Sequence, residues 1–176
     1  MFVPTILITG PVGSGKTSVA FEASAQLEAA GIAHALVDTD ELDRIFPAPP
    51  GDPHKTALTQ YNLAAVWENL RAAGAPRLIL TMVAASLERE LPWVHAAVPG
   101  AQITVIRLRT SESALLERVR RREIGSGEDY HARHSVEQAR AMAREADGEG
   151  TIIVETTGRQ VVDVAGEVLA RGGWIE

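Results

Sequence analysis

The sequence predicts an α/β fold in which helices cover both faces of a parallel sheet. Along the 176 residues, five short apolar runs alternate with longer amphipathic stretches. The apolar runs are continuously hydrophobic, which is typical of strands buried on both faces of a parallel sheet. Hydrophobic residues make up 45% of the chain and charged residues 23%, as in ordinary globular domains. We therefore expect one domain spanning residues 1–176, with right-handed crossovers.

The elements follow in order along the chain. The strands are expected at 5–9, 35–37, 78–80, 103–106 and 152–154. The helices are expected at roughly 16–30, 56–73, 111–122, 135–146 and 161–171. Trp67 has helical spacing with Leu63 and Leu70, so we expect it in the core. Pro92 predicts a broken helix packing on the sheet. Residues 47–54 and 123–134 are expected to form functional loops on one rim of the sheet.

Composition narrows the range of partners. The net charge is −6 at pH 7, so binding to nucleic acid through a basic face is not expected. The first ten residues lack the basic start of a signal peptide, and no apolar stretch is long enough for a membrane span. The chain has no cysteine, which suits a reducing compartment. We expect a cytoplasmic monomer or homodimer without a nucleic-acid or membrane partner.

A glycine-rich segment carries the most specific signal. It reads Gly10-Pro11-Val12-Gly13-Ser14-Gly15-Lys16-Thr17, followed by Ser18. This segment follows an apolar strand and opens a helix, as a phosphate loop requires. Its backbone N–H groups and the helix N-terminus would bind phosphate, Lys16 would supply a charge, and Thr17 a hydroxyl for Mg²⁺. A turn without a ligand and a dinucleotide fingerprint are the alternatives, but the latter would place its third glycine at Ser18.

An acid for the metal is expected after the second strand. The third strand ends in Met82-Val83 without Asp or Glu, unlike in motors, AAA-type ATPases and most switch GTPases. Asp38 and Asp40 lie two residues apart on an extended segment and would project to the same side. One could hold Mg²⁺ and the other could face an acceptor hydroxyl. The alternative is that Asp40 caps a helix over 41–46.

Arginines cluster at the end of the fourth expected helix. Arg118 and Arg122 are four residues apart, hence on one helical face, before the glycine-bearing 123–134 segment. They could clamp a triphosphate and neutralise charge on the transferring phosphoryl group. The alternative is a solvated basic helix end that complements its own dipole.

Together these motifs resemble the nucleoside monophosphate kinase-like branch of phosphate-loop kinases, which includes shikimate kinase, gluconate kinase, adenylylsulfate kinase and chloramphenicol phosphotransferase. The resemblance implies a three-layer fold whose five-stranded sheet has the order 2-3-1-4-5. It also implies an acceptor-binding region at about 40–74 and a lid at about 118–134. Asp38 would organise Mg²⁺, Asp40 would contact the acceptor, Arg118 would pack on adenine and Arg122 on phosphate. Gly158 and Arg159 would frame the base.

The expected activity is transfer of the γ-phosphate of ATP, with Mg²⁺, to a hydroxyl of a small molecule. Lys16, Asp40 and Arg122 are the expected catalytic residues, and Arg44 and Tyr61 could join Asp40 in binding the acceptor. The Asn-Lys-x-Asp guanine motif is missing, which favours ATP over GTP. No paired basic residues follow the third strand, which weakens a nucleoside monophosphate as acceptor. A regulatory nucleotide-binding module, or a kinase acting on a nucleotide or an antibiotic, remain the alternatives.

Overall fold

Five parallel strands form the centre of the molecule. The computed structural model describes residues 2–122, 128–144 and 148–175, with the backbone alone at 122 and 128–134. The strands are β1 (Val3–Thr9), β2 (Ala35–Asp38), β3 (Leu78–Met82), β4 (Ala101–Arg109) and β5 (Ile152–Glu155). Their order is β2-β3-β1-β4-β5, with every neighbouring pair parallel. The predicted fold class and strand order are thereby confirmed.

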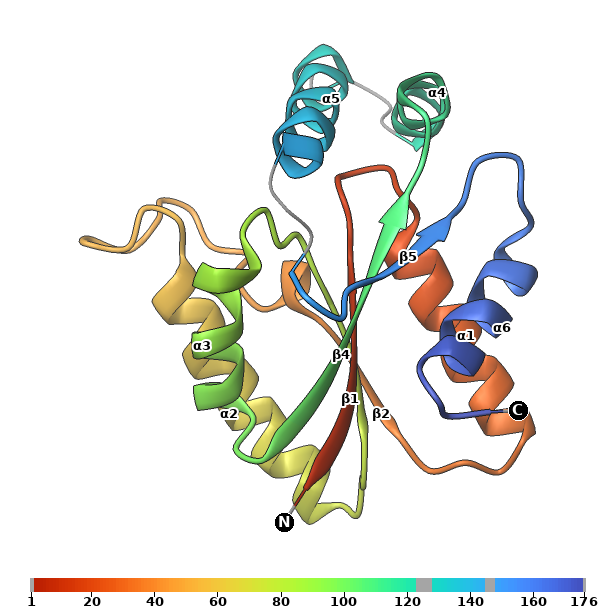
Figure 1. Ribbon diagram of the computed structural model, residues 1–176. Coiled ribbons are helices and arrows are strands. Elements are labelled where there is room, and N and C mark those ends of the chain that lie inside the picture. Colours follow the sequence, from red (N-terminus) through yellow and green to blue (C-terminus); the bar gives the residue numbers. More distant parts are fainter. Residues whose placement is uncertain (1, 123–127, 145–147, 176) are drawn as a thin grey trace.

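Helices cover both faces of this sheet, and two more lie across its upper edge (Figure 1). The helices are α1 (Lys16–Ala29), α2 (Thr56–Ala72), α3 (Leu87–Ala97), α4 (Glu112–Arg122), α5 (Glu128–Arg144) and α6 (Val161–Arg171). Helices α2 and α3 cover one face, α1 and α6 cover the other, and α4 and α5 lie above the carboxyl ends of the strands. No helix within the described ranges is long and apolar enough to cross a membrane.

The core consists of two apolar clusters, one on each face of the sheet. Leu7 and Leu80 belong to the cluster under α2 and α3, whereas Ile6 and Ile79 belong to the cluster under α1 and α6. This division follows from the alternation of side chains along a strand. The two buried faces explain why the strands are continuously hydrophobic in sequence. They also hold the carboxyl ends of the strands rigidly at one edge.

Three local predictions were wrong. Helix α3 is continuous through Pro92, because its packing residues Val94 and Ala97 are buried and proline removes only one helical hydrogen bond. Residues 41–46 form no α-helix: a short 3₁₀ turn, Thr39–Glu41, follows β2 instead. Residues 128–134, expected in a loop, belong to α5, which begins at Glu128, and residues 123–127 lie outside the described residues.

Trp67 anchors α2 to the sheet, as predicted, with only 2% of its surface exposed. Trp67→Ala is expected to lower the free energy of unfolding by about 3–5 kcal/mol, because it removes buried apolar surface and leaves a cavity. Chemical denaturation followed by circular dichroism measures the change. The exposed neighbour Glu68 provides the control, since Glu68→Ala is expected to change stability by less than about 0.5 kcal/mol. Equal effects of the two substitutions would contradict the packing.

Candidate active site

The phosphate loop (residues 10–17) connects β1 to the first turn of α1. Gly13 and Gly15 have φ angles of 84° and 98°, a region that residues with a Cβ rarely adopt. A Cβ on Gly13 would lie 2.9 Å from Cγ2 of Val119, so α4 packs directly on the loop. The loop and the α4 segment above it therefore form one closely packed unit.

Lys16 lies inside this loop rather than on the surface. Its side chain is only 6% exposed, and its Nζ donates hydrogen bonds to the carbonyl oxygens of Gly10 (3.0 Å) and Pro11 (3.2 Å). A cavity of about 290 Å³ adjoins the loop, here called the phosphate-loop cavity. Its lining residues are Val12, Gly13, Gly15, Lys16, Thr17, Ser18, Asp40, Arg118 and Val119. A buried ammonium at a helix N-terminus makes this cavity suitable for an anion.

Thr17 and Asp38 meet at the edge of the phosphate-loop cavity. The Thr17 hydroxyl donates to Oδ2 of Asp38 at 2.9 Å, although β3 separates β1 from β2 in the sheet. The other oxygen, Oδ1, accepts a hydrogen bond from the backbone N–H of Asp40 at 3.1 Å. It is thus Asp38, not Asp40, that caps the turn after β2. A hydroxyl and a carboxylate oxygen side by side are the donor types that Mg²⁺ prefers.

Asp40 lines both the phosphate-loop cavity and a second cavity of about 560 Å³, here called the α2–α3 cavity. Solvent reaches Asp40, yet protein surrounds it on several sides, and this partial burial raises the pKa of its carboxyl above the ordinary value for aspartate. Lys16 opposes this rise in the pKa of Asp40, whereas Asp38 and Asp43 add to it. A carboxylate shared by two cavities can contact a ligand in each.

The α2–α3 cavity is assembled from segments far apart in sequence: the turn after β2, the loop before α2 and α2 itself, the end of β3, and α3. Its lining residues are Thr39, Asp40, Asp43, His54, Thr56, Thr59, Met82, Val83, Arg89, Glu90 and Trp93. On α3, Nε1 of Trp93 donates a 2.6 Å hydrogen bond to Oε2 of Glu90. The cavity thus combines charged groups with an indole, which suits a polar molecule that also has apolar surface.

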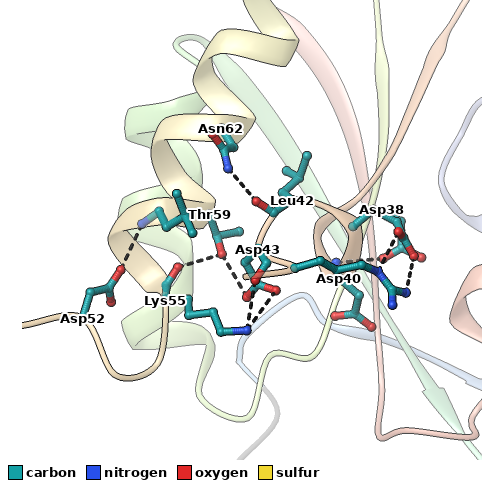
Figure 2. A network of polar contacts seen from close by, with 11 residues as sticks. Asp38, Asp40, Leu42, Asp43, Asp52, Lys55, Thr59 and Asn62 are labelled. Atoms are coloured by element: carbon teal, nitrogen blue, oxygen red, sulfur yellow. Dashed lines mark hydrogen bonds and ion pairs between the residues drawn. The ribbon is translucent and has the colours of Figure 1, made fainter. Parts of the chain in front are cut away.

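A polar network holds one wall of the α2–α3 cavity in place (Figure 2). Nζ of Lys55 donates to the carbonyl oxygen of Asp43 at 2.9 Å and lies 3.9 Å from its carboxylate. The Thr59 hydroxyl reaches the same carboxylate at 3.4 Å. The side chain of Asp52 accepts from the N–H of Leu58 and so caps α2. These contacts tie the loop before α2 to the helix.

Arg118, on α4, lies between the phosphate loop and the segment that follows β5. Its guanidinium donates to the carbonyl oxygen of Ser14 (3.2 Å) and to the hydroxyl and carbonyl oxygens of Thr156 (2.9 and 2.8 Å). It therefore joins the phosphate loop to the segment after β5. A third cavity of about 240 Å³ opens here and includes Arg118, Thr156 and Arg159 in its lining.

Arg159 itself is held by α6. Its Nη1 lies 2.6 Å from Oε2 of Glu167, and this hydrogen bond lowers the pKa of the Glu167 carboxyl. Gly158, next to it, has a φ of 69° and forms the turn before α6. Arg159 lines the third cavity, and Gly158 precedes it in the turn after β5.

Other predicted site residues differ in their placement. Ser18 lines the phosphate-loop cavity, and the backbone N–H of Val12 donates to Oε1 of Gln138 on α5.

The predicted acceptor-binding residues other than Asp40 lie outside the α2–α3 cavity. Arg44 is exposed and paired with Glu41 in a loop rather than a helix, and it does not line the α2–α3 cavity. Tyr61 is 73% exposed and does not line that cavity either. The side chain of Arg122, at the end of α4, lies outside the described part of the chain.

Residues that sequence reasoning missed include three cavity-lining side chains on α3. Arg89 and Trp93 are four residues apart and so share a helical face, while Leu87, Val94 and Ala97 face the core. This amphipathic spacing was visible in the sequence, but Pro92 led to the prediction of a broken helix. His54, Thr56 and Thr59 also line the cavity and carried no motif of their own.

Solved structures of several kinases have the same architecture as this chain. A gluconokinase from Sinorhizobium meliloti 1021 matches with a TM-score of 0.61 and 23% identity, covering 98% of this chain and 94% of that one. A tunicamycin resistance protein from Deinococcus radiodurans matches with a TM-score of 0.67 and 20% identity, covering 98% of this chain and 97% of that one. Shikimate kinase from Acinetobacter baumannii, in complex with shikimate, matches with a TM-score of 0.56 and 21% identity, covering 95% of this chain and 91% of that one. The comparison with curated proteins found no match.

A family model described as an AAA domain matches residues 6–143, which include the phosphate loop, Asp38, Asp40 and Arg118. The acid at the end of the third strand remains absent, because β3 ends at Met82 and Val83 follows. The carboxylate that lies beside Thr17 belongs to Asp38, at the end of β2. With its sheet order and phosphate loop, the chain has the fold of the nucleoside monophosphate kinase-like phosphate-loop kinases and belongs to this AAA domain family.

Proposed function

We propose that the protein is an ATP- and Mg²⁺-dependent kinase that transfers the γ-phosphate to a hydroxyl of a small molecule. The observation that carries this proposal is the position of Asp40, which lines the phosphate-loop cavity and the α2–α3 cavity together. A carboxylate so placed can face the phosphoryl donor and the acceptor hydroxyl at once. Gluconokinase and shikimate kinase among the solved structures of the same fold support a small-molecule acceptor.

In this mechanism, the phosphate-loop N–H groups and Lys16 bind the β- and γ-phosphates. Asp40 accepts the proton of the acceptor hydroxyl as the new bond forms between the acceptor oxygen and the γ-phosphorus. The bond from the γ-phosphorus to the bridging oxygen breaks, and ADP leaves with that oxygen. On α4, Arg122 is assigned to the charge on the phosphate oxygens and Arg118 to the base of the nucleotide.

The base of the nucleotide is assigned to the third cavity, beside Arg118, Gly158 and Arg159. The guanidinium of Arg118 is already oriented by Thr156 and can stack on an aromatic base. Acceptor binding is assigned to Asp40 and the other residues that line the α2–α3 cavity, in place of Arg44 and Tyr61. This assignment follows the observed cavity walls.

The residues beside the phosphate loop fit a magnesium ion. Thr17 and Asp38 supply oxygen ligands within 2.9 Å of each other, and no group of three metal-ligating side chains occurs within the described ranges. That pattern suits Mg²⁺, which is usually held by one or two protein oxygens, by waters and by nucleotide phosphates. When bound, the ion neutralises charge on the phosphate oxygens.

Asp38→Asn is expected to raise the Mg²⁺ concentration needed for half-maximal transfer by about tenfold, because a neutral amide is a weaker ligand than a carboxylate. Asn keeps one oxygen, which can still accept from the N–H of Asp40, and its amide NH2 can donate to the Thr17 hydroxyl in place of the bond that Oδ2 accepts, so the turn should stay intact. Titrating Mg²⁺ at saturating ATP measures the shift. Asp52→Asn, a change in the cap of α2, is the control and should leave the Mg²⁺ dependence unchanged. An unchanged midpoint in Asp38→Asn would contradict the metal assignment.

A panel of acceptors tests the proposed function. ADP release is measured with sugars, sugar acids, shikimate, nucleosides, nucleoside monophosphates and aminoglycosides, each against the reaction without acceptor. At least one class should raise ADP release well above that background and yield a phosphorylated product by mass spectrometry. A nucleotide-binding module without transfer would bind Mg·ATP in calorimetry yet form no such product with any class.

A further inference from the structure

Arg89 stands apart from most arginines of this protein. It lies in the first turn of α3 and lines the α2–α3 cavity. Its guanidinium forms no ion pair or hydrogen bond with any residue that the structure describes. In contrast, Arg44, Arg140 and Arg159 each pair with a glutamate. Arg89 therefore presents its donors to the cavity without a protein partner.

Local electrostatics do not explain an arginine at this position. The N-terminal end of a helix carries a partial positive charge, so a cation in the first turn is unfavourable and an anion is favourable. Glu88 and Glu90 follow this rule, whereas Arg89 between them does not. Residues that conflict with local preferences tend to mark functional sites. The position of Arg89 is better explained by a ligand than by helix stability.

Two of the three carboxylates that line the same cavity have hydrogen-bond partners in the protein. Asp43 contacts Lys55 and Thr59, and Glu90 accepts the hydrogen bond of the Trp93 indole. Asp40 borders the phosphate-loop cavity, where the proposed function uses it. Glu90 keeps its negative charge, because the indole that donates to it is neutral. Among the described residues that line this cavity, Arg89 is the one arginine or lysine, and so it is the group that can donate charge-assisted hydrogen bonds to an anion.

We propose that Arg89 binds an anionic group of the acceptor, so that the acceptor is a hydroxy compound carrying a carboxylate or a phosphate. This inference rests on the proposed kinase function. A guanidinium can donate two parallel hydrogen bonds to either anion, which fixes the orientation of the molecule as well as its charge. Trp93, one helical turn further along α3, gives this end of the cavity an aromatic wall. Arg89 is thus a specificity-determining residue.

Binding to Arg89 can be followed through Trp93. The protein is saturated with Mg·ADP, so that the phosphate loop is occupied, and is titrated at low ionic strength, because an exposed charge is easily screened. The probes are gluconate as carboxylate, glucose 6-phosphate as phosphate, glucose as neutral and glucosamine as cationic compound. At least one anionic probe should change the tryptophan fluorescence saturably and bind more tightly than glucose and glucosamine. Trp93→Phe should lose this signal.

Substitution of Arg89 then tests the residue itself. Arg89→Gln should weaken the binding of that anionic probe by about tenfold, and Arg89→Lys should retain part of the affinity. Arg71→Gln, at the exposed end of α2, is the matched control and should bind as the parent protein does. The inference is overturned if no anionic probe binds more tightly than glucose, or if Arg89→Gln binds it unchanged.

Transfer assays separate the inference from the function on which it rests. If an acceptor is phosphorylated, Arg89→Gln should raise its KM by about tenfold and leave kcat within about twofold, because Arg89 binds a group remote from the reacting hydroxyl. Phosphorylation of a neutral or cationic acceptor, indifferent to Arg89→Gln, would overturn the inference and leave the kinase function standing. Arg89-dependent anion binding without any transfer would instead support the anion site while removing the kinase function.

Discussion

Lys16→Ala should reduce phosphoryl transfer by about 10³-fold or more, the largest effect expected for any single substitution in this protein. Lys16 is the only cation that the structure buries within the phosphate loop. Its removal takes away the charge that would neutralise the β- and γ-phosphates. Steady-state ADP release with a competent acceptor measures transfer, and calorimetry with Mg·ATP measures binding. Both should fall, because in the proposed mechanism the ammonium contacts the donor before and during transfer.

Loss of folding must be separated from loss of chemistry in this variant. The Lys16 ammonium also holds the carbonyl oxygens of Gly10 and Pro11, so the loop itself could relax without it. Thermal unfolding without nucleotide should therefore be compared with that of Glu28→Ala, a change at an exposed position of α1. Retained turnover in a folded Lys16→Ala protein would refute the assignment of the donor site.

Asp40→Asn should lower kcat by about 10²- to 10⁴-fold, the range expected for loss of a general base. The asparagine has nearly the same shape but cannot accept the hydroxyl proton. The affinity for Mg·ATP should change by less than about threefold, since other groups hold the phosphates. Rapid-quench measurement of product in a single turnover isolates the transfer step. Equal losses in nucleotide affinity and in kcat would contradict the role of base.

The pH dependence of transfer gives an independent check on Asp40. Partial burial raises the pKa of its carboxyl, so activity should fall on the acid side at a pH above the ordinary pKa of aspartate. The raised pKa of Asp40 also affects the stability of the fold, but this contribution decreases with rising pH whereas activity increases. The folded protein holds the Asp40 proton more tightly than the unfolded chain, so this group contributes stability at low pH that is lost as pH rises through its raised pKa. At neutral pH, Asp40→Asn should therefore be at least as stable as the parent.

The acid limb and the stability measurement together distinguish a desolvated base from a surface carboxylate. Asp163, an exposed acid in the first turn of α6, is a suitable control. Asp163→Asn should leave the pH profile of kcat unchanged. An acid limb that persists in the residual activity of Asp40→Asn would show that another group titrates.

The strands and the phosphate loop were predictable because their signals are local. Each strand is a continuous apolar run, and each was confirmed with its ends shifted by a few residues at most. The phosphate loop needs only contiguous residues, since its glycines, its lysine and the start of α1 act on one another directly. The strand order was predicted through the family resemblance, and the observed order confirms it.

The contact between Thr17 and Asp38 shows where local reasoning succeeds only in part. An acid after β2 was expected, and the structure brings Asp38 within 2.9 Å of the threonine. The helix expected over 41–46 was wrong, because Asp38 caps a short turn and the loop after it is tied to α2 by Lys55 and Asn62. Arg44, in the loop after this turn, pairs with Glu41 and does not line the α2–α3 cavity. The sequence pattern around residues 38–46 did not reveal this placement.

By itself, the sequence determined that this protein has a parallel α/β sheet and a loop built for phosphate. Only the tertiary structure decided which residues form the α2–α3 cavity and that Asp40 borders two cavities. The physical reason is the sheet: β3 lies between β1 and β2, so α2 and α3 are brought together on one face beside Asp40, although Arg89 and Trp93 lie far from it along the chain. Such contacts depend on packing between elements, and no pattern within a single segment records them.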